Sequence, residues 1–212
     1  MHNYAQSNQT PPADLAELAP TPEQDLEARP LIAQLTSRHR RQVKDHLLRL
    51  PPDDRRLRFG HAISDESIVT YVRGIHFGRD AAFGAFDERG ELTAFGHLAF
   101  TKSEHMAELG MSVAPEARRR GIGLLLLERA GEHARNRNYR VLMMAFVPEN
   151  TALAALARRA GMRLVLDPAE PHAYLGLEPP DAASVLHEAW DEAVAAIDLG
   201  LRRVASGPVT SA

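Results

Sequence analysis

The segment between residues 106 and 146 changes its hydrophobic period twice, and this change restricts the fold more than any other feature of the chain. Residues 106–113 have the length and apolar content of a strand. Residues 141–146 form a continuous apolar run, which is typical of a buried parallel strand. Between them, apolar residues recur at helical spacing, at Ile122, Leu125, Leu126, Ala130 and Ala134. Strand, helix and buried strand within about 40 residues predict a right-handed βαβ unit.

The segments on either side of this unit predict further elements of one mixed α/β domain. Before it, the patterns indicate a basic helix that starts at Thr36 or Ser37 and ends near Leu50, a second helix capped by Ser64 or Asp65, and a β-hairpin of residues 81–86 and 91–100. After it, they indicate a helix over residues 150–160, short strands at 163–166 and 173–177, and an amphipathic helix over 181–204.

Composition separates this domain from the two ends of the chain. The first 29 residues hold several prolines and acidic residues and few apolar ones, so burial cannot offset the entropy lost on ordering them. We therefore expect an acidic, Pro-rich leader over 1–29, a domain over 30–178, a C-terminal helix over 179–205 and a tail over 206–212. The apolar stripe of that helix, which includes Leu186, Trp190 and Ile197, is expected to pack on the domain or on a second subunit, as in a homodimer.

Several classes of protein are disfavoured by composition. The chain has no Cys, which excludes disulfide scaffolds and thiolate sites, and its net charge of -3 gives no reason to expect a nucleic-acid partner. No apolar run approaches the ~20 residues that span a bilayer, and no secretory signal is recognised, so a soluble cytoplasmic protein without membrane contact is expected. No metal site is expected, because no i, i+4 pair on a helix is formed by His61, His76, His97, His105 and His172.

The junction between the predicted strand and helix carries the most informative motif, Arg118-Arg119-Arg120-Gly121-Ile122-Gly123. A helix N-terminus presents unpaired N–H groups and a partial positive charge, which normally favour acidic residues. Three arginines at this end are destabilising unless an anion lies among them, and two glycines leave the backbone amides open to a phosphate. The alternative is a solvated basic loop. A Walker loop and a dinucleotide fingerprint both fail, since Gly-Lys-Ser/Thr is missing and Leu126 stands where a third glycine is needed.

These residues resemble the Arg/Gln-x-x-Gly-x-Gly/Ala signature of the GNAT superfamily of acyl-CoA-dependent N-acyltransferases. Residues 107–115 are similar to the fourth strand of that family, and Asn150, Leu153, Leu156 and the pair Gly161-Met162 resemble its later pattern. The resemblance extends over residues 31–177, and residues 51–59 also resemble the start of bacterial protein-lysine acetyltransferase modules. It implies a mixed, mostly antiparallel sheet of about six to seven strands, with a parallel βαβ core and flanking helices.

The resemblance further implies an acetyl-CoA site and transfer of the acetyl group to a primary amine of a small molecule or a protein lysine. Backbone groups of Met111 and Val113 would pair with the pantetheine arm, and the 118–123 loop would hold the pyrophosphate. The strand at 141–146 would diverge from the strand at 106–113 and open a slot for the thioester. The residues so assigned to the cofactor are Met111, Ser112, Val113, Arg118, Arg119, Arg120, Gly121, Ile122, Gly123 and Asn150.

Glu108 is the candidate base for the attacking amine, because it shares a strand face with Gly110 and Ser112. Alternatively, its carboxylate faces solvent or pairs with an arginine. The usual acid of the family is a Tyr seven residues after the Asn, where this chain has Ala157.

That departure leaves two outcomes open. Either the thiolate is protonated by Tyr174, His172, Ser112 or water, or the protein binds acyl-CoA as a non-catalytic sensor or regulatory module. A third class, an interaction protein, would use the basic residues of helix 38–49.

Overall fold

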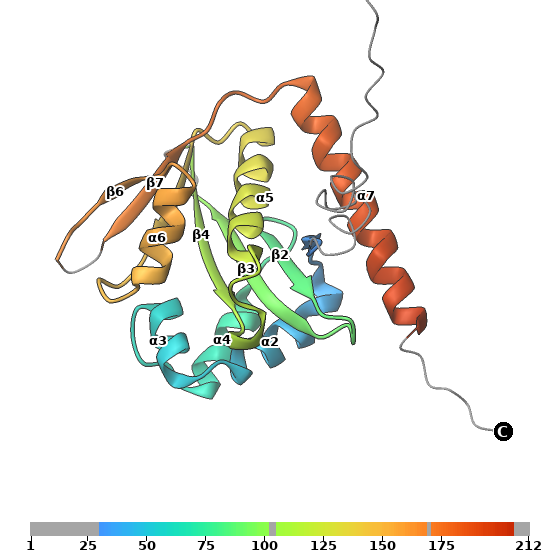
Figure 1. Cartoon of the computed structure of the whole chain (residues 1–212), viewed down its shortest axis with the longest axis horizontal. Helices are drawn as coiled ribbons and strands as arrows, with labels where there is room; N and C mark the ends of the chain where they lie inside the picture. The colour runs from blue at the N-terminus through green and yellow to red at the C-terminus, as the bar shows by residue number, and fades with distance from the viewer. Residues whose placement is uncertain (1–29, 102–104, 169–170, 206–212) are drawn as a thin grey trace, which may run out of the picture.

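The computed structural model describes residues 30–101, 105–168 and 171–205. The expected leader (1–29) and tail (206–212) lie outside these ranges. The described elements are β1 (Ala33–Gln34), η2 (Ser37–His39), α2 (Arg40–Arg49), α3 (Pro52–Phe59), α4 (Asp65–Gly74), β2 (Ala81–Phe86), β3 (Leu92–Phe100), β4 (Met106–Val113), η3 (Pro115–Ala117), α5 (Ile122–Asn136), β5 (Val141–Ala145), α6 (Thr151–Arg159), β6 (Arg163–Val165), β7 (His172–Gly176) and α7 (Ala182–Ala205) (Figure 1).

The strands form one seven-stranded sheet in the order β1-β2-β3-β4-β5-β7-β6. Only the β4–β5 pair is parallel, and the other described pairs are antiparallel. Helix α5 connects β4 to β5, so the predicted βαβ unit lies at the centre of the sheet. The expected fold class, a mostly antiparallel mixed sheet with a parallel core, is confirmed.

Helices cover both faces of the sheet, because the strands bury apolar side chains on both sides. On one face, Leu126 of α5 joins Phe83 and Leu98 in a core that also includes apolar residues of β4 and β5. On the other face, Leu47 of α2 and Ile68 of α4 belong to a second core with side chains of β2 and β3. Figure 1 shows α5 on one side of the strands and α2, α3 and α4 gathered at the lower end of the sheet.

Helix α3 is an element that the sequence patterns did not predict. The basic helix α2 ends before Pro51, as expected, and Pro52 then begins a new helix. The signals for it stand in the sequence, since Pro suits the first helical position and Asp53 and Asp54 complement the dipole of the first turn. Gly60 follows its last residue. With no buried residue in α3, its apolar pattern was too weak to reveal it.

Helix α7 docks on the domain through a face that is partly polar. Ser184, Glu188, Ala195 and Leu199 are buried, whereas the predicted apolar stripe points away from the domain. The exposed fractions of that stripe are large, at 48% for Val185, 70% for Leu186, 70% for Trp190, 64% for Ile197 and 65% for Leu201. The stripe was expected to pack on the domain or on a second subunit. The domain does not cover it.

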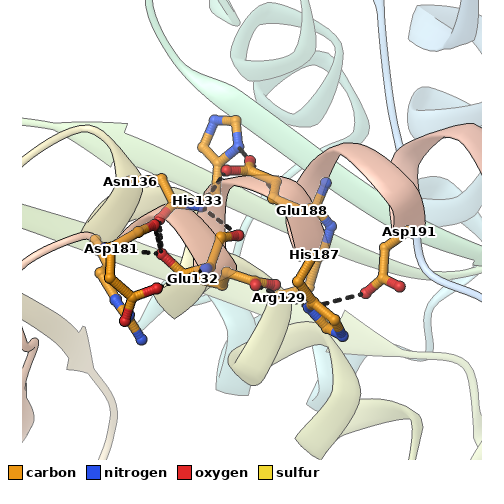
Figure 2. A network of polar contacts seen from close by, with 10 residues as sticks. Arg129, Glu132, His133, Asn136, Asp181, His187, Glu188 and Asp191 are labelled. Carbon is orange, nitrogen blue, oxygen red and sulfur yellow. Dashed lines mark hydrogen bonds and ion pairs between the residues drawn. The ribbon is translucent and has the colours of Figure 1, made fainter.

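Figure 2 shows the polar network through which α7 meets α5. The Glu188 carboxylate accepts hydrogen bonds from His133 Nδ1 at 2.5 Å and from Asn136 Nδ2 at 2.6 Å, and it lies 3.1 Å from Nη1 of the buried Arg129. Nearby, His187 Nδ1 lies 2.9 Å from Glu132 and 3.7 Å from Asp191.

The side chains of Glu132, His187 and Asp191 lie close enough together to hold a metal ion. Their mutual ion pairs across and along the helices already account for this cluster. Across the described ranges, no helix is both long and apolar enough to cross a membrane.

Candidate functional site

The parallel ladder between β4 and β5 is short, and the two strands separate beyond it. It joins Met106, Ala107 and Glu108 to Val141, Leu142 and Met143, whereas β4 runs on to Val113 and β5 to Ala145. The opposite edge of β4 pairs with β3 as far as Val113. Within the described sheet, the β5-facing edge of β4 is thus unpaired from Leu109 onward. The divergence implied by the family resemblance is confirmed.

A cavity of about 850 Å³ occupies the opening between the separated strands. This volume lies in the range of small-molecule and cofactor sites. The walls come from β4 and β5, the N-terminus of α5, helix α6 and helix α3. The lining residues include Arg58 of α3, Glu108, Gly110 and Ser112 of β4, Gly121 and Gly123 at the start of α5, and Asn150 at the start of α6.

The N-terminus of α5 lines this cavity with Gly121, Ile122, Gly123 and Leu124. Its N-cap, Gly121, has φ 77°, gives no side-chain cap, and is followed by no acidic residue in the first turn. Arg119 is also in the left-handed region, with φ 64°, which is uncommon for a residue with a side chain. Positive φ at two of three successive positions turns the loop tightly into the helix, and such geometry is common at ligand sites.

The three arginines of this loop have different surroundings. Arg118 Nη2 lies 2.6 Å from Asp54 of α3, and its Nε donates to the Val113 carbonyl oxygen at 3.1 Å. Arg118 therefore ties the loop to α3 and to the end of β4. Arg119 and Arg120 are exposed, and no ion pair to either of them occurs among the described residues.

The cavity brings together nine of the ten residues that the resemblance assigned to the cofactor; the exception is Arg120, which does not line it. Asn150 is the N-cap of α6, where its Oδ1 accepts a hydrogen bond from the Leu153 amide at 3.0 Å. Because this cap uses the carbonyl oxygen, the two N–H donors of the Asn150 side chain are not consumed by it.

Glu108 lies at the mouth of the opening, at the last position where β4 pairs with β5. Its side chain is exposed, and none of the described arginines forms an ion pair with it. Glu108 therefore lies against the cavity and also contacts solvent, and it is not paired with a described arginine.

Ser112 forms a hydrogen bond to a buried histidine that the sequence patterns did not single out. His46 Nε2 lies 2.9 Å from Ser112 Oγ, and His46 Nδ1 lies 3.2 Å from the Leu92 carbonyl oxygen. Because a carbonyl can only accept, Nδ1 carries the proton and Nε2 accepts from the Ser112 hydroxyl. Burial lowers the pKa of His46 to about 4, so the imidazole is neutral at pH 7. Ser112 thus presents an acceptor lone pair toward the cavity.

The other residues considered as acids lie elsewhere. Ala157, at the position of the usual Tyr, is fully buried in the core. Tyr174 and His172 lie on β7, where their rings stack on each other at 6.0 Å, and neither lines the cavity. Of the three side chains proposed as acid, the cavity includes Ser112.

Arg58 is the main residue of the site that sequence reasoning missed. The sequence assigns no role to Arg58 within residues 51–59, whereas α3 places its guanidinium over Gly110 of β4. A Cβ at position 110 would lie 2.5 Å from Arg58 Nη1, so the glycine leaves the room that the guanidinium occupies. The signal that could have found it is the helix start at Pro52, which fixes the face of α3 that Arg58 occupies.

A chain of hydrogen bonds runs from Arg58 into the core. Arg58 Nη2 donates to Tyr71 Oη at 2.9 Å, Tyr71 Oη lies 2.8 Å from His97 Nδ1, and His97 Nε2 lies 3.3 Å from Asp80 Oδ2. Burial lowers the pKa of His97, and the nearby Arg58 lowers it further, although Asp80 opposes this. Burial raises the pKa of Asp80, but the hydrogen bonds from Arg79 and His97 outweigh burial and leave this pKa below its usual value.

These protonation states fix the direction of each hydrogen bond that links Arg58, Tyr71, His97 and Asp80. His97 donates from Nε2 to the Asp80 carboxylate, accepts at Nδ1 from the Tyr71 hydroxyl, and so leaves the Tyr71 oxygen to accept from Arg58.

The chain matches the model of one known protein family. The model of the acetyltransferase (GNAT) family matches residues 41–162, which hold all the elements that surround the cavity. No curated protein sequence matches the chain.

Many solved structures share the fold. The GNAT domain of S. lividans PAT is 17% identical, with a TM-score of 0.60 over 69% of this chain and 89% of that one. A phosphinothricin acetyltransferase from Sinorhizobium meliloti, solved with AcCoA, is 15% identical, with a TM-score of 0.56 over 72% and 94%. Spermidine N-acetyltransferase from Vibrio cholerae, solved with CoA and spermine, is 16% identical, with a TM-score of 0.54 over 68% and 94%.

Proposed function

The chain belongs to the acetyltransferase (GNAT) family, and on this premise we propose that it moves an acetyl group from acetyl-CoA to a primary amine by direct attack of the amine on the thioester. The observation that carries the proposal is the opening between β4 and β5, which ends at a helix N-terminus without acidic residues in its first turn. Of the three arginines before this helix, Arg118 pairs with Asp54, whereas Arg119 and Arg120 have no ion pair among the described residues. An unbalanced positive end of this kind favours an anionic ligand such as a pyrophosphate.

The residues around the cavity fit the donor in two ways. The unpaired edge of β4 from Leu109 to Val113 offers backbone groups to which the extended pantetheine arm adds like a strand, with Met111 and Val113 as the partners. Gly121 and Gly123 leave the first amides of α5 open, and Arg119 and Arg120 supply charge beside them. Ser112 and the Asn150 amide contribute an acceptor and donors along the arm.

The proposed roles in the reaction follow from where the side chains lie. Acetyl-CoA supplies the activated acetyl group. Glu108, directly or through water, takes a proton from the acceptor's ammonium group, so that the neutral nitrogen forms the new C–N bond while the C–S bond breaks, and the nitrogen loses its second proton to water as the amide forms. A backbone amide of β4 stabilises the developing oxyanion. The Ser112 hydroxyl donates its hydrogen bond to His46 and is therefore not free to act as the acid. Water protonates the departing thiolate.

A second function, a non-catalytic acyl-CoA sensor, is favoured by the buried Ala157. Two measurements on the same sample distinguish it from the transferase: a thermal shift on adding acetyl-CoA, and release of free thiol when an amine is present. The transferase requires both. Stabilisation by acetyl-CoA without amine-dependent thiol release across a panel of amines would support the sensor.

We propose as well that the apolar face of α7 pairs with the same face of a second copy. Leu186, Trp190, Ile197 and Leu201 recur at helical spacing along one exposed side, and a helix of this kind is self-complementary about a twofold axis. Light scattering coupled to size exclusion tests this: wild type is expected to be a dimer and Trp190→Glu a monomer. A monomeric wild type would refute the pairing.

We also propose the domain boundaries expected from the sequence, with residues 2–28 not required for folding or donor binding. Deletion of residues 2–28 is then expected to leave the melting temperature and the affinity for acetyl-CoA unchanged. Loss of folded protein on that deletion would move the boundary.

A further inference from the structure

We propose that Arg58 binds a carboxylate of the acceptor, and that the acceptor is accordingly a small amine that carries a carboxylate, such as an amino acid. This inference rests on the proposed function, because it names the substrate class of the same site. It follows from the position of the guanidinium, from its unused donors, and from its place beside Glu108.

The guanidinium of Arg58 is held at the wall of the cavity. It lies over Gly110, and its carbon atom is 5.0 Å from the centre of the Phe59 ring and 5.7 Å from that of Tyr71. The chain of Tyr71, His97 and Asp80 anchors one of its nitrogen atoms. A guanidinium fixed in this way needs little further ordering when it binds a ligand.

Arg58 differs from the neighbouring arginines in its partners. Arg55 pairs with Asp65, Arg56 with Glu149 and Arg118 with Asp54. For Arg58, in contrast, no ion pair occurs within the described ranges, and its buried Nε has no hydrogen-bond partner. A half-buried guanidinium without an anion is costly, whereas a carboxylate that binds it by two parallel hydrogen bonds offsets this cost.

Arg58 and Glu108 place opposite charges on the same face of β4. Glu108 lies two residues before Gly110, over which the guanidinium sits, and two residues of a strand span about 6.7 Å. An acceptor whose ammonium group approaches Glu108 can therefore bring a carboxylate to Arg58. A polyamine, which has only positive groups, would meet an unpaired cation at this position.

The test compares acceptors that differ by the carboxylate. The wild-type protein is given acetyl-CoA with γ-aminobutyrate or with propylamine, whose amino groups have similar basicity, and then with 6-aminohexanoate or with pentylamine. Initial rates of thiol release give kcat and KM for each acceptor. In parallel, calorimetry measures binding of γ-aminobutyrate to the complex with CoA, which needs no turnover.

Two variants of Arg58 and one control complete the design. Arg58→Gln is expected to raise KM for the carboxylate-bearing acceptors about 10- to 100-fold, with little change for propylamine, because it removes a charge-assisted pair. Arg58→Lys keeps the charge but not the paired donors. Its KM for these acceptors is expected to lie between those of wild type and Arg58→Gln. Arg56→Gln, two positions earlier on α3 and outside the cavity lining, is the matched control and is expected to leave every acceptor unchanged.

The positioning residues have a separate expectation. Tyr71→Phe removes the anchor of Arg58, so it should raise KM for γ-aminobutyrate while leaving kcat and the KM for acetyl-CoA unchanged. A purely structural role for Tyr71 would instead lower the melting temperature and change all three constants together.

The outcomes separate this inference from the function on which it rests. Equal KM values for γ-aminobutyrate and propylamine, together with no effect of Arg58→Gln, would refute the inference and leave the transferase in place. Binding of γ-aminobutyrate that depends on Arg58, without thiol release from any acceptor, would support the inference and refute the transferase. If Arg58→Gln changes neither the calorimetric affinity for γ-aminobutyrate nor the KM of any acceptor, Arg58 has no role in recognition and the inference is refuted.

Discussion

Replacing Glu188 by Gln should destabilise the protein by about 3 kcal/mol near pH 7. The side chain is 11% exposed, and burial raises its pKa, yet the hydrogen bonds from His133 and Asn136 outweigh burial and bring the pKa to about 2. A fall from 4.5 to about 2 corresponds to about 3 kcal/mol of interaction between the folded protein and the carboxylate. Burial also lowers the pKa of His133, so the cations opposite Glu188 are Arg129 at 3.1 Å and Arg137 at 3.6 Å, and the substitution would leave Arg129 buried without an anion.

The lowered pKa of Glu188 determines the direction in which the stability changes with pH. The folded pKa of Glu188 lies below the unfolded one, so the carboxylate stabilises the folded protein fully above about pH 4.5. This contribution decreases as the pH falls toward 2. The difference in stability between wild type and Glu188→Gln should therefore be largest near neutral pH and narrow in acid.

Urea denaturation followed by circular dichroism measures the free energy of unfolding for both proteins at several pH values. Glu192→Gln is the matched control, because the same chemical change is made one turn later on α7 at an exposed position. A loss below about 1 kcal/mol for Glu188→Gln at neutral pH, or an equal loss for Glu192→Gln, would contradict the role assigned to this carboxylate.

Three further predictions concern the cavity. Gly121→Val should weaken acetyl-CoA binding more than Arg119→Ala, since it places a branched side chain at φ 77° and beside the first amides of α5; calorimetry with unchanged affinity would rule out the phosphate cradle. Glu108→Gln should keep that affinity but lower kcat by about 10²-fold and shift the acidic limb of the pH–rate profile; a wild-type profile would make Glu108 a bystander. Because burial lowers the pKa of His46 from 6.5 to about 4, wild type should lose about 2 kcal/mol of stability between pH 7 and about pH 5 as the unfolded chain takes up a proton; His46→Gln should show a smaller pH effect in the same denaturation assay.

The sequence predicts the centre of the fold because its elements differ in period. The run at 106–113 and β4 share their bounds, and the apolar run from Val141 agrees with β5, since the central strands are buried and strongly patterned. Helix α3 escaped prediction because it buries none of its residues completely, so no apolar period marks it. For α7 the sequence does predict an apolar stripe, but it cannot show that the helix docks by Glu188 and Ser184 instead.

The site, too, could be predicted only where its residues have a local sequence pattern. The loop of residues 118–123 could be found because charge and glycine at a helix start have local physical meaning. The hydrogen bonds of His46 to Ser112 and of Arg58 to Tyr71 join residues 66 and 13 positions apart. Nothing local in the sequence marks these pairs, so they become visible only when α2, α3 and α4 are packed against the sheet.

Transfer of a labelled acetyl group from acetyl-CoA to an amine is the direct test of the proposed acetyltransferase activity. The wild-type protein is incubated with acetyl-CoA labelled in the acetyl group, with each amine of the acceptor panel in turn, and the products are identified by mass spectrometry while free thiol is counted. We expect labelled N-acetyl product in a one-to-one ratio with released thiol, dependent on the protein and on the amine. Tight binding of acetyl-CoA with neither product nor thiol above the uncatalysed rate would contradict the proposed activity.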